Sequence, residues 1–173
     1  MRILNTRSTV ILLLVSVMAF GSQTRQFSKD DIEYVLDLPS PTWQAVSRID
    51  VHDHPEFING NDASNGYLRL RKVLVNQPTT ASELFRQQET WELQRLPGYV
   101  VCSECDGVRF NGRLLGAVFS YEYVNGGKAM YGRIYYLQID SRAFYSLHFT
   151  VARDRLSAIS EDMDSIARSF HLK

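Results

Sequence analysis

Two cysteines three residues apart are the most evident candidates for chemistry in this sequence. Cys102 and Cys105 form a C-x-x-C motif. In an oxidising compartment such a pair can close a disulfide, whereas a catalytic redox pair needs a thiolate whose pKa is lowered by a cation or a helix N-terminus. The acidic neighbours Glu104 and Asp106 would instead raise the thiol pKa. The motif therefore favours a structural disulfide or inert thiols over a metal half-site, and favours a redox-active pair least.

Histidine and carboxylate side chains form a second candidate cluster at His52, Asp53, His54 and Glu56. His52 and His54 share a face if this segment is a strand, and imidazole is a good ligand for zinc or copper. The competing interpretation is a polar edge strand that ends at Pro55. That interpretation is favoured, because a structural metal usually needs four ligands. We expect no cofactor, with a divalent metal at His52 and His54 as the alternative.

Aromatic side chains crowd three neighbouring strand-like segments between Phe119 and Phe149. Alternation along a strand directs some of them into a core and others outward, and tyrosine is enriched where proteins bind partners. A binding face would contain Tyr121, Tyr123, Tyr135 and Tyr145. The alternative is that these rings are cross-strand pairs that stabilise a sheet.

Other catalytic patterns are absent from the sequence. It contains no G-x-S-x-G nucleophile elbow and no phosphate-binding loop. His148 lies in an alternating segment and is interpreted as an ordinary strand residue. The acidic run over residues 161–164 is interpreted as the solvated face of an amphipathic helix. These observations give no support to an enzymatic role.

The first 21 residues have the pattern of a secretion signal. Arg2 and Arg7 precede an apolar run from Val10 to Phe20, and small residues lie near Gly21. The run is shorter than the about 20 apolar residues that a membrane span needs. We therefore expect a cleaved signal peptide over residues 1–21, export to the periplasm or outside the cell, and no membrane span after cleavage.

Charge excludes one class of partner. The whole chain has 19 basic and 19 acidic side chains, and loss of the signal removes two of the basic ones. Proteins that bind nucleic acid normally carry a basic excess, because phosphate neutralisation supplies most of their affinity. We expect no nucleic-acid partner.

The remaining sequence predicts one α+β domain over residues 30–173, after a flexible lead-in over residues 22–29. A capping box at Thr80 and Glu83 predicts a helix over Thr80–Arg95, and apolar spacing of three and four predicts a second over Asp154–Phe170, with Asp154 as its N-cap. Alternating apolar and polar side chains predict strands over residues 32–38, 43–51, 67–75, 99–104, 113–124, 129–139 and 143–151. Short connections make the last strands antiparallel. The expected fold is an antiparallel sheet of about six or seven strands flanked by helices.

Two stretches support this order by resemblance. LDLPSPTWQAVS, from Leu36 to Ser47, resembles the strand, proline turn and tryptophan near the start of the PsbP-like domain. The stretch from Gly132 to Phe170 resembles the closing hairpin and C-terminal helix of the same family, whose α/β/α sandwich is shared by the photosystem II extrinsic protein PsbP and a yeast Ran-binding import factor. The matched residues are of types that fill a core, so the resemblance concerns the fold more than chemistry.

The resemblance also implies a function, because family members with known roles are mostly non-enzymatic accessory or binding proteins. We therefore expect an exported, monomeric domain that contacts an unidentified protein partner or assembly. The alternative from another class is a small redox or metal-handling protein that uses Cys102, Cys105, His52 and His54.

Overall fold

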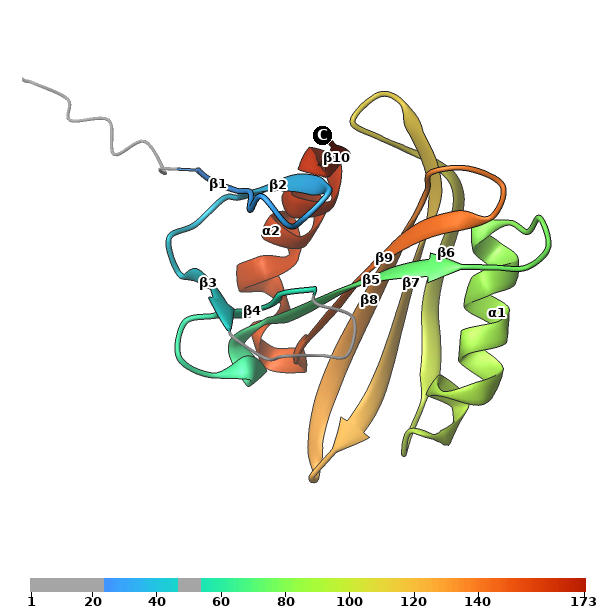
Figure 1. The fold of residues 1–173 in the computed structure, drawn as a ribbon. Helices are drawn as coiled ribbons and strands as arrows, with labels where there is room; N and C mark the ends of the chain where they lie inside the picture. The colour runs from blue at the N-terminus through green and yellow to red at the C-terminus, as the bar shows by residue number, and fades with distance from the viewer. Residues whose placement is uncertain (1–23, 47–53) are drawn as a thin grey trace, which may run out of the picture.

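The computed structural model of the chain describes residues 24–46 and 54–173 (Figure 1). The described strands are β1 (Arg25–Phe27), β2 (Tyr34–Leu38), β3 (Trp43–Val46), β4 (Glu56–Asn59), β5 (Tyr67–Leu74), β6 (Val100–Phe110), β7 (Leu114–Asn125), β8 (Lys128–Gln138), β9 (Ala143–Ala152) and β10 (His171–Leu172). The helices are α1 (Ala81–Trp91) and α2 (Leu156–Ser169), with short 3-10 helices η1 (Ala63–Asn65), η2 (Leu93–Arg95) and η3 (Arg153–Arg155). No helix in these ranges is long and apolar enough to cross a membrane.

A seven-stranded antiparallel sheet is the centre of the molecule, in the order β3-β4-β5-β9-β8-β7-β6. A smaller sheet has the order β1-β2-β10. The turn between β7 and β8 places Gly126 and Gly127 at positive φ, which glycine adopts without steric cost. The α+β class and the antiparallel sheet with flanking helices are confirmed.

The large sheet has one helix on each face (Figure 1). On one face, α2 covers a core that includes Trp43, Leu68, Phe149, Met163 and Phe170. On the other face, α1 covers a second core, in which the rings of Phe85 and Phe119 stack with centroids 3.8 Å apart. Full burial of one such side chain contributes about 1.5–3 kcal/mol to the free energy of unfolding.

The small sheet packs against the end of α2. The Asp37 N–H on β2 donates to Ser169 Oγ at 2.8 Å, and the rings of Tyr34 and Phe170 stack with centroids 5.3 Å apart. The polar sequence around Arg25–Phe27 gives no indication of β1, which pairs with β2. The small sheet depends on contacts between distant parts of the chain, so local pattern does not reveal it.

Both predicted helices form, and their starts differ in kind. The capping box of α1 is confirmed: Glu83 N–H donates to Thr80 Oγ1 at 3.2 Å, and Thr80 N–H donates to Glu83 Oε2 at 2.9 Å. The prediction of Asp154 as an N-cap is wrong. Asp154 lies within η3, and α2 begins two residues later, at Leu156, with no side-chain cap. An N-cap needs extended backbone, and here the extended residue is Ala152, before η3.

Candidate functional site

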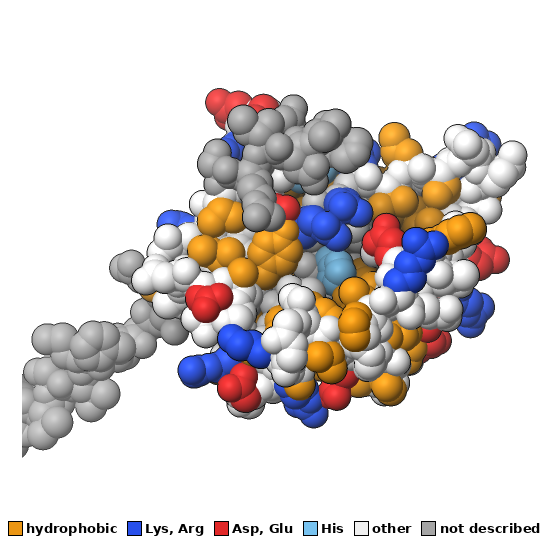
Figure 2. Space-filling view, turned by 90° about the horizontal axis from the view of Figure 1, so that it is seen from below, with side chains coloured by type: hydrophobic (Ala, Val, Ile, Leu, Met, Phe, Trp, Pro, Cys, Tyr) orange, Lys and Arg blue, Asp and Glu red, His pale blue; other side chains and the backbone are white. Residues whose placement is uncertain are grey.

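One part of the sheet, on the face that carries α1, combines basic and aromatic side chains. Register places Arg69 on β5 opposite His148 on β9, and Arg71 lies two residues further along the same face. Tyr121 and Tyr123 on β7 belong to this face as well, because Tyr121 is opposite Gly132 and Gly132 is opposite Thr150. We call Arg69, Arg71, Tyr121, Tyr123 and His148 the basic site. The view from below in Figure 2 shows basic side chains and a histidine gathered at a hollow beside hydrophobic side chains.

A glycine on β8 leaves room for the aromatic part of the basic site. A hydrogen bond of 2.6 Å joins Tyr121 Oη to His148 Nε2, from β7 to β9. The tyrosine ring must therefore pass over β8, which lies between these strands, and it does so at Gly132. A Cβ at Gly132 would lie only 2.2 Å from Tyr121 Cζ. The absence of a side chain at Gly132 thus permits the contact between Tyr121 and His148.

Burial and positive charge keep His148 neutral. Its imidazole packs on the face of the sheet that carries α1. Burial of the ring, together with the charges of Arg69 and Arg71, lowers its pKa to about 3. Burial also raises the pKa of Tyr121 well above its ordinary value. At neutral pH the basic site therefore holds a neutral imidazole, a protonated phenol and two guanidinium charges.

The two arginines are half-buried, and the ion pairs between described residues include neither of them. The Nε atoms of Arg69 and Arg71 are buried and have no hydrogen-bond partner among residues 24–46 and 54–173. Glu56 on β4 is opposite Arg69 in register, yet the ion pairs between described residues include neither arginine. A buried polar atom without a partner costs about 1–3 kcal/mol, so these groups are unusual in a folded protein.

A cavity of about 310 Å³ adjoins the basic site between α1 and the sheet. Arg71 belongs to both, and the remaining lining includes Val73, Leu84, Gln88 and Trp91. The sequence places Trp91 on the apolar stripe of the helix, but 68% of its surface is exposed at the end of α1. The basic site is therefore continuous with a partly apolar depression that has an exposed indole at its rim.

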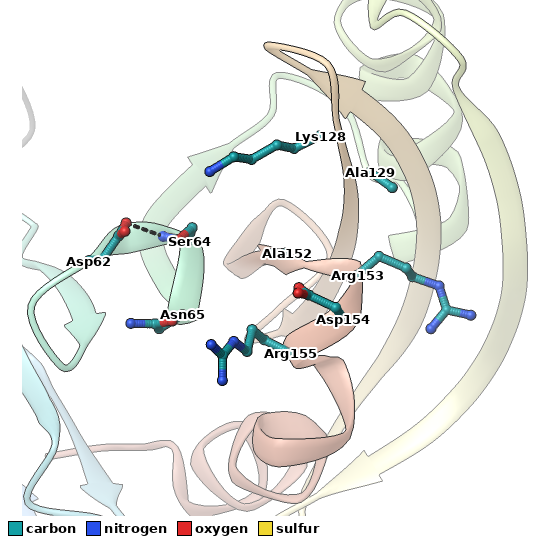
Figure 3. A pocket seen from close by; sticks show the side chains of 9 residues that line it. All are labelled: Asp62, Ser64, Asn65, Lys128, Ala129, Ala152, Arg153, Asp154 and Arg155. Atoms are coloured by element: carbon teal, nitrogen blue, oxygen red, sulfur yellow. Dashed lines mark hydrogen bonds between the residues drawn. The ribbon is translucent and has the colours of Figure 1, made fainter.

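A larger depression of about 690 Å³ lies between η1, the β7–β8 turn and η3 (Figure 3). Two of its charged side chains have contacts within the chain. Arg153 forms an ion pair with Glu122 at 2.5 Å and points away from the other side chains of the depression. Asp62 accepts the Ser64 N–H at 2.8 Å, and this contact lowers the pKa of Asp62. These contacts engage Arg153 and Asp62 within the protein itself.

The cysteines lie within β6, at an edge of the large sheet. Both are free and exposed. Three residues of extended strand separate their Cα atoms by about 10 Å, which exceeds the about 7 Å limit for a disulfide. Burial and the charge of Glu122 raise the pKa of Cys102, and Arg153 acts in the opposite direction. Of the two favoured alternatives, a structural disulfide or inert thiols, the structure contains free thiols and no disulfide between Cys102 and Cys105.

The proposed metal ligands are only partly described. His52 and Asp53 lie outside the described residues. The imidazole of His54 lies 6.0 Å from the rings of both Tyr34 and Tyr145, measured between centroids. Within the described ranges no three His, Cys, Asp or Glu side chains form a group that could hold a metal ion.

The sheet divides the four tyrosines of the predicted binding face between its two sides. Tyr121, Tyr135 and Tyr145 are buried, and only Tyr123 is partly exposed. Tyr135 Oη donates to Asp164 at 2.5 Å, and Tyr145 Oη donates to Glu33, both on the α2 side. The residues that sequence reasoning missed are Arg69 and Arg71. Their spacing of two in an alternating strand was the available signal that they share a face.

Comparison with known proteins identifies the fold. No protein-family model and no curated protein matches the chain. The solution structure of cyanobacterial PsbP (CyanoP) from Synechocystis sp. PCC 6803 is similar, with a TM-score of 0.62 and 15% identity over 92% of this chain and 99% of that one. The Ran-binding protein Mog1p of Saccharomyces cerevisiae has a TM-score of 0.65 and 8% identity, over 87% of this chain and 96% of that one.

A third similar structure is LpqN of Mycobacterium tuberculosis, which is involved in cell envelope biogenesis. Its TM-score is 0.60 and its identity 14%, over 87% of this chain and 92% of LpqN. The chain therefore has a PsbP/Mog1-like fold, as the resemblance of its two sequence stretches predicts. At these identities the similarity concerns the fold and not the site, because one fold supports many functions.

Proposed function

We propose that this chain is an exported, non-enzymatic binding protein that contacts a protein partner through the basic site. The observation that carries the proposal is the pair of half-buried arginines, Arg69 and Arg71, whose Nε atoms have no partner among the described residues. A guanidinium group without an ion-pair partner among the described residues gains from a ligand that supplies a carboxylate to its other nitrogens. Arginine and tryptophan are also the residue types that most often carry binding energy at protein interfaces, and Trp91 is exposed beside them.

The titration behaviour of the basic site supports binding over acid–base catalysis. A general base works best when its pKa lies near the operating pH. The pKa of His148 is about 3, and its Nε2 is occupied by Tyr121. Neither side chain is thus suited to transfer protons at neutral pH.

The N-terminal sequence pattern and the structural neighbours agree with this role. Arg2, Arg7 and the following apolar run support export. Among the similar structures, Mog1p is a Ran-binding protein and LpqN is involved in cell envelope biogenesis. The redox alternative is less favoured, because a reactive thiol needs a lowered pKa and that of Cys102 is raised.

Photo-cross-linking tests the proposal. The full mature domain would carry the photoreactive residue benzoylphenylalanine at position 91 and would be irradiated in an extract of its native source. Leu74 is the matched control position, since 71% of its surface is exposed and it lies on the opposite face of the sheet. We expect one discrete adduct from position 91 and none from position 74.

The captured protein must then bind the purified domain in isothermal titration calorimetry. Equal labelling from both positions, or no adduct from position 91, would contradict the proposal. Export is tested separately, by sequencing the N-terminus of the protein recovered outside the cytoplasm. An N-terminus near residue 22 is expected, and an intact Met1 would refute cleavage.

A further inference from the structure

We infer that the basic site binds a peptide segment of the partner in which a carboxylate side chain stands next to an apolar one. The inference rests on the proposed function and names the chemistry of the contact. Arg69 and Arg71 lie on one face of β5, two residues apart. Guanidinium groups bind carboxylates through two parallel hydrogen bonds, which fixes geometry as well as adding energy.

The environment of the two arginines makes an anionic ligand favourable. Their Nε atoms are buried without partners, and no carboxylate among the described residues forms an ion pair with either side chain. His148 lies opposite Arg69 on β9 and is neutral, so it adds no positive charge that would compete for an anion. A ligand carboxylate would supply an ion-pair partner to guanidinium groups that have none among the described residues.

The adjoining cavity specifies what should follow the carboxylate. Its volume of about 310 Å³ and its lining by Val73, Leu84 and Trp91 suit one apolar side chain. Arg71 borders the cavity, so the acidic and apolar groups of the ligand must be close neighbours. A single carboxylate with an apolar neighbour is a feature of a peptide rather than of a polyphosphate.

One acidic residue of the cavity determines where the ligand carboxylate can lie. Glu92 also lines the cavity, and its side chain accepts a hydrogen bond from Gln88 at 3.1 Å. It would repel an acidic group placed near α1, which directs the ligand carboxylate toward β5. The formal net charge of the chain is zero, so general attraction of polyanions does not explain the arginines.

A peptide array provides the test. The full mature domain is applied to an array of random 12-residue peptides of widely different net charge, and bound sequences are remeasured in solution by fluorescence anisotropy. We expect Asp or Glu adjacent to an apolar residue to be enriched among the bound peptides. Arg71→Gln should weaken their binding about tenfold or more, because it removes a charge-assisted hydrogen-bond donor to the ligand carboxylate. Glu92→Gln should strengthen it.

Arg86→Gln is the matched control, since Arg86 is an exposed arginine on α1 and the substitution removes the same charge. It should leave the affinity unchanged, and circular dichroism of each variant verifies folding. If Arg71→Gln does not fold, Arg71→Lys replaces it, because lysine keeps the charge and loses the paired hydrogen bonds. A bound set without acidic enrichment, no bound peptide, or an unchanged affinity in the Arg71 variant overturns the inference.

Inorganic phosphate serves as a competitor. Arginine-dependent binding of phosphate without any peptide binding would assign the site to a free anion and would also overturn the inference. The two proposals fail separately. An adduct at position 91, together with no acidic preference on the peptide array, would overturn only the inference about the ligand's chemistry. The absence of any adduct at position 91 would overturn the proposed binding function.

Discussion

Tyr121 Oη and His148 Nε2 lie 2.6 Å apart, although their strands, β7 and β9, are separated by β8. The contact spans the intervening strand at Gly132, where no side chain stands between the ring and the backbone. Arg69 lies next to His148 on the far side. One hydrogen bond therefore connects the aromatic half of the basic site to its cationic half.

Gly132→Ala should destabilise the protein through this contact. The new Cβ would lie 2.2 Å from Tyr121 Cζ, so the ring must leave its position or the strand must shift. Overpacking of this kind costs about 1–3 kcal/mol. Urea denaturation followed by circular dichroism measures the change in the free energy of unfolding.

The background Tyr121→Leu provides the control, because the three atoms that the new Cβ would approach most closely all belong to Tyr121. In that background Gly132→Ala should cost much less, as expected for two residues in direct contact. Additive losses would show that the ring is not the obstacle.

Stability should fall as the pH decreases, partly because of His148. Its pKa is about 3 in the folded protein and about 6.5 in an unfolded chain. Between these values the unfolded state binds a proton that the folded state does not. The contribution is therefore complete above about pH 6.5 and is lost toward pH 3, by up to about 1.4 kcal/mol for each pH unit.

His148→Gln should flatten this dependence, since the amide does not titrate. The measurement is the free energy of unfolding in urea at several values between pH 7.5 and pH 4.5, for the wild-type protein and the variant. A variant whose curve runs parallel to that of the wild type would mean that His148 has the same pKa in the folded and unfolded states, which contradicts the prediction.

Local pattern predicts the helices and most strands of this fold, because helix caps and alternation are properties of neighbouring residues. The capping box at Thr80 and Glu83 needs only a four-residue window. The connection predicted after residue 104 is instead part of one continuous strand, β6, which accommodates Gly107 with a register shift between Cys105 and Val108. A bulge is a property of the pair of strands, and one strand's sequence does not display it.

The basic site could not be predicted in the same way. Arg69 and His148 are 79 residues apart and meet only through the pairing of β5 with β9. Sequence reasoning interprets His148 as an ordinary strand residue, since nothing near it signals the two arginines. The contact between Tyr121 and His148 depends further on the register of β8, which places Gly132 between them.

Asp164→Ala should destabilise the attachment of α2 to the sheet. Asp164 accepts hydrogen bonds from Tyr135 Oη at 2.5 Å and from Arg133 Nη1 at 3.4 Å. The substitution removes the acceptor of a buried hydroxyl, which costs about 1–3 kcal/mol. Glu161→Ala is the control, because Glu161 is exposed on the same helix, and it should change the free energy of unfolding by less than about 0.5 kcal/mol. Equal losses in thermal or urea denaturation would argue against the role of Asp164.

The two cysteines should behave as slow, independent thiols. Burial and Glu122 raise the pKa of Cys102, so less thiolate is present at neutral pH. In the variant Cys105→Ser, alkylation of Cys102 by iodoacetamide should be several times slower in the folded protein than in urea. Mass spectrometry measures the rate, and the intact mass of the wild-type protein distinguishes a dithiol from a disulfide. Alkylation that is faster in the folded protein, or a disulfide that forms and opens reversibly with glutathione, would instead support the redox function and would require the backbone of β6 to rearrange between Cys102 and Cys105.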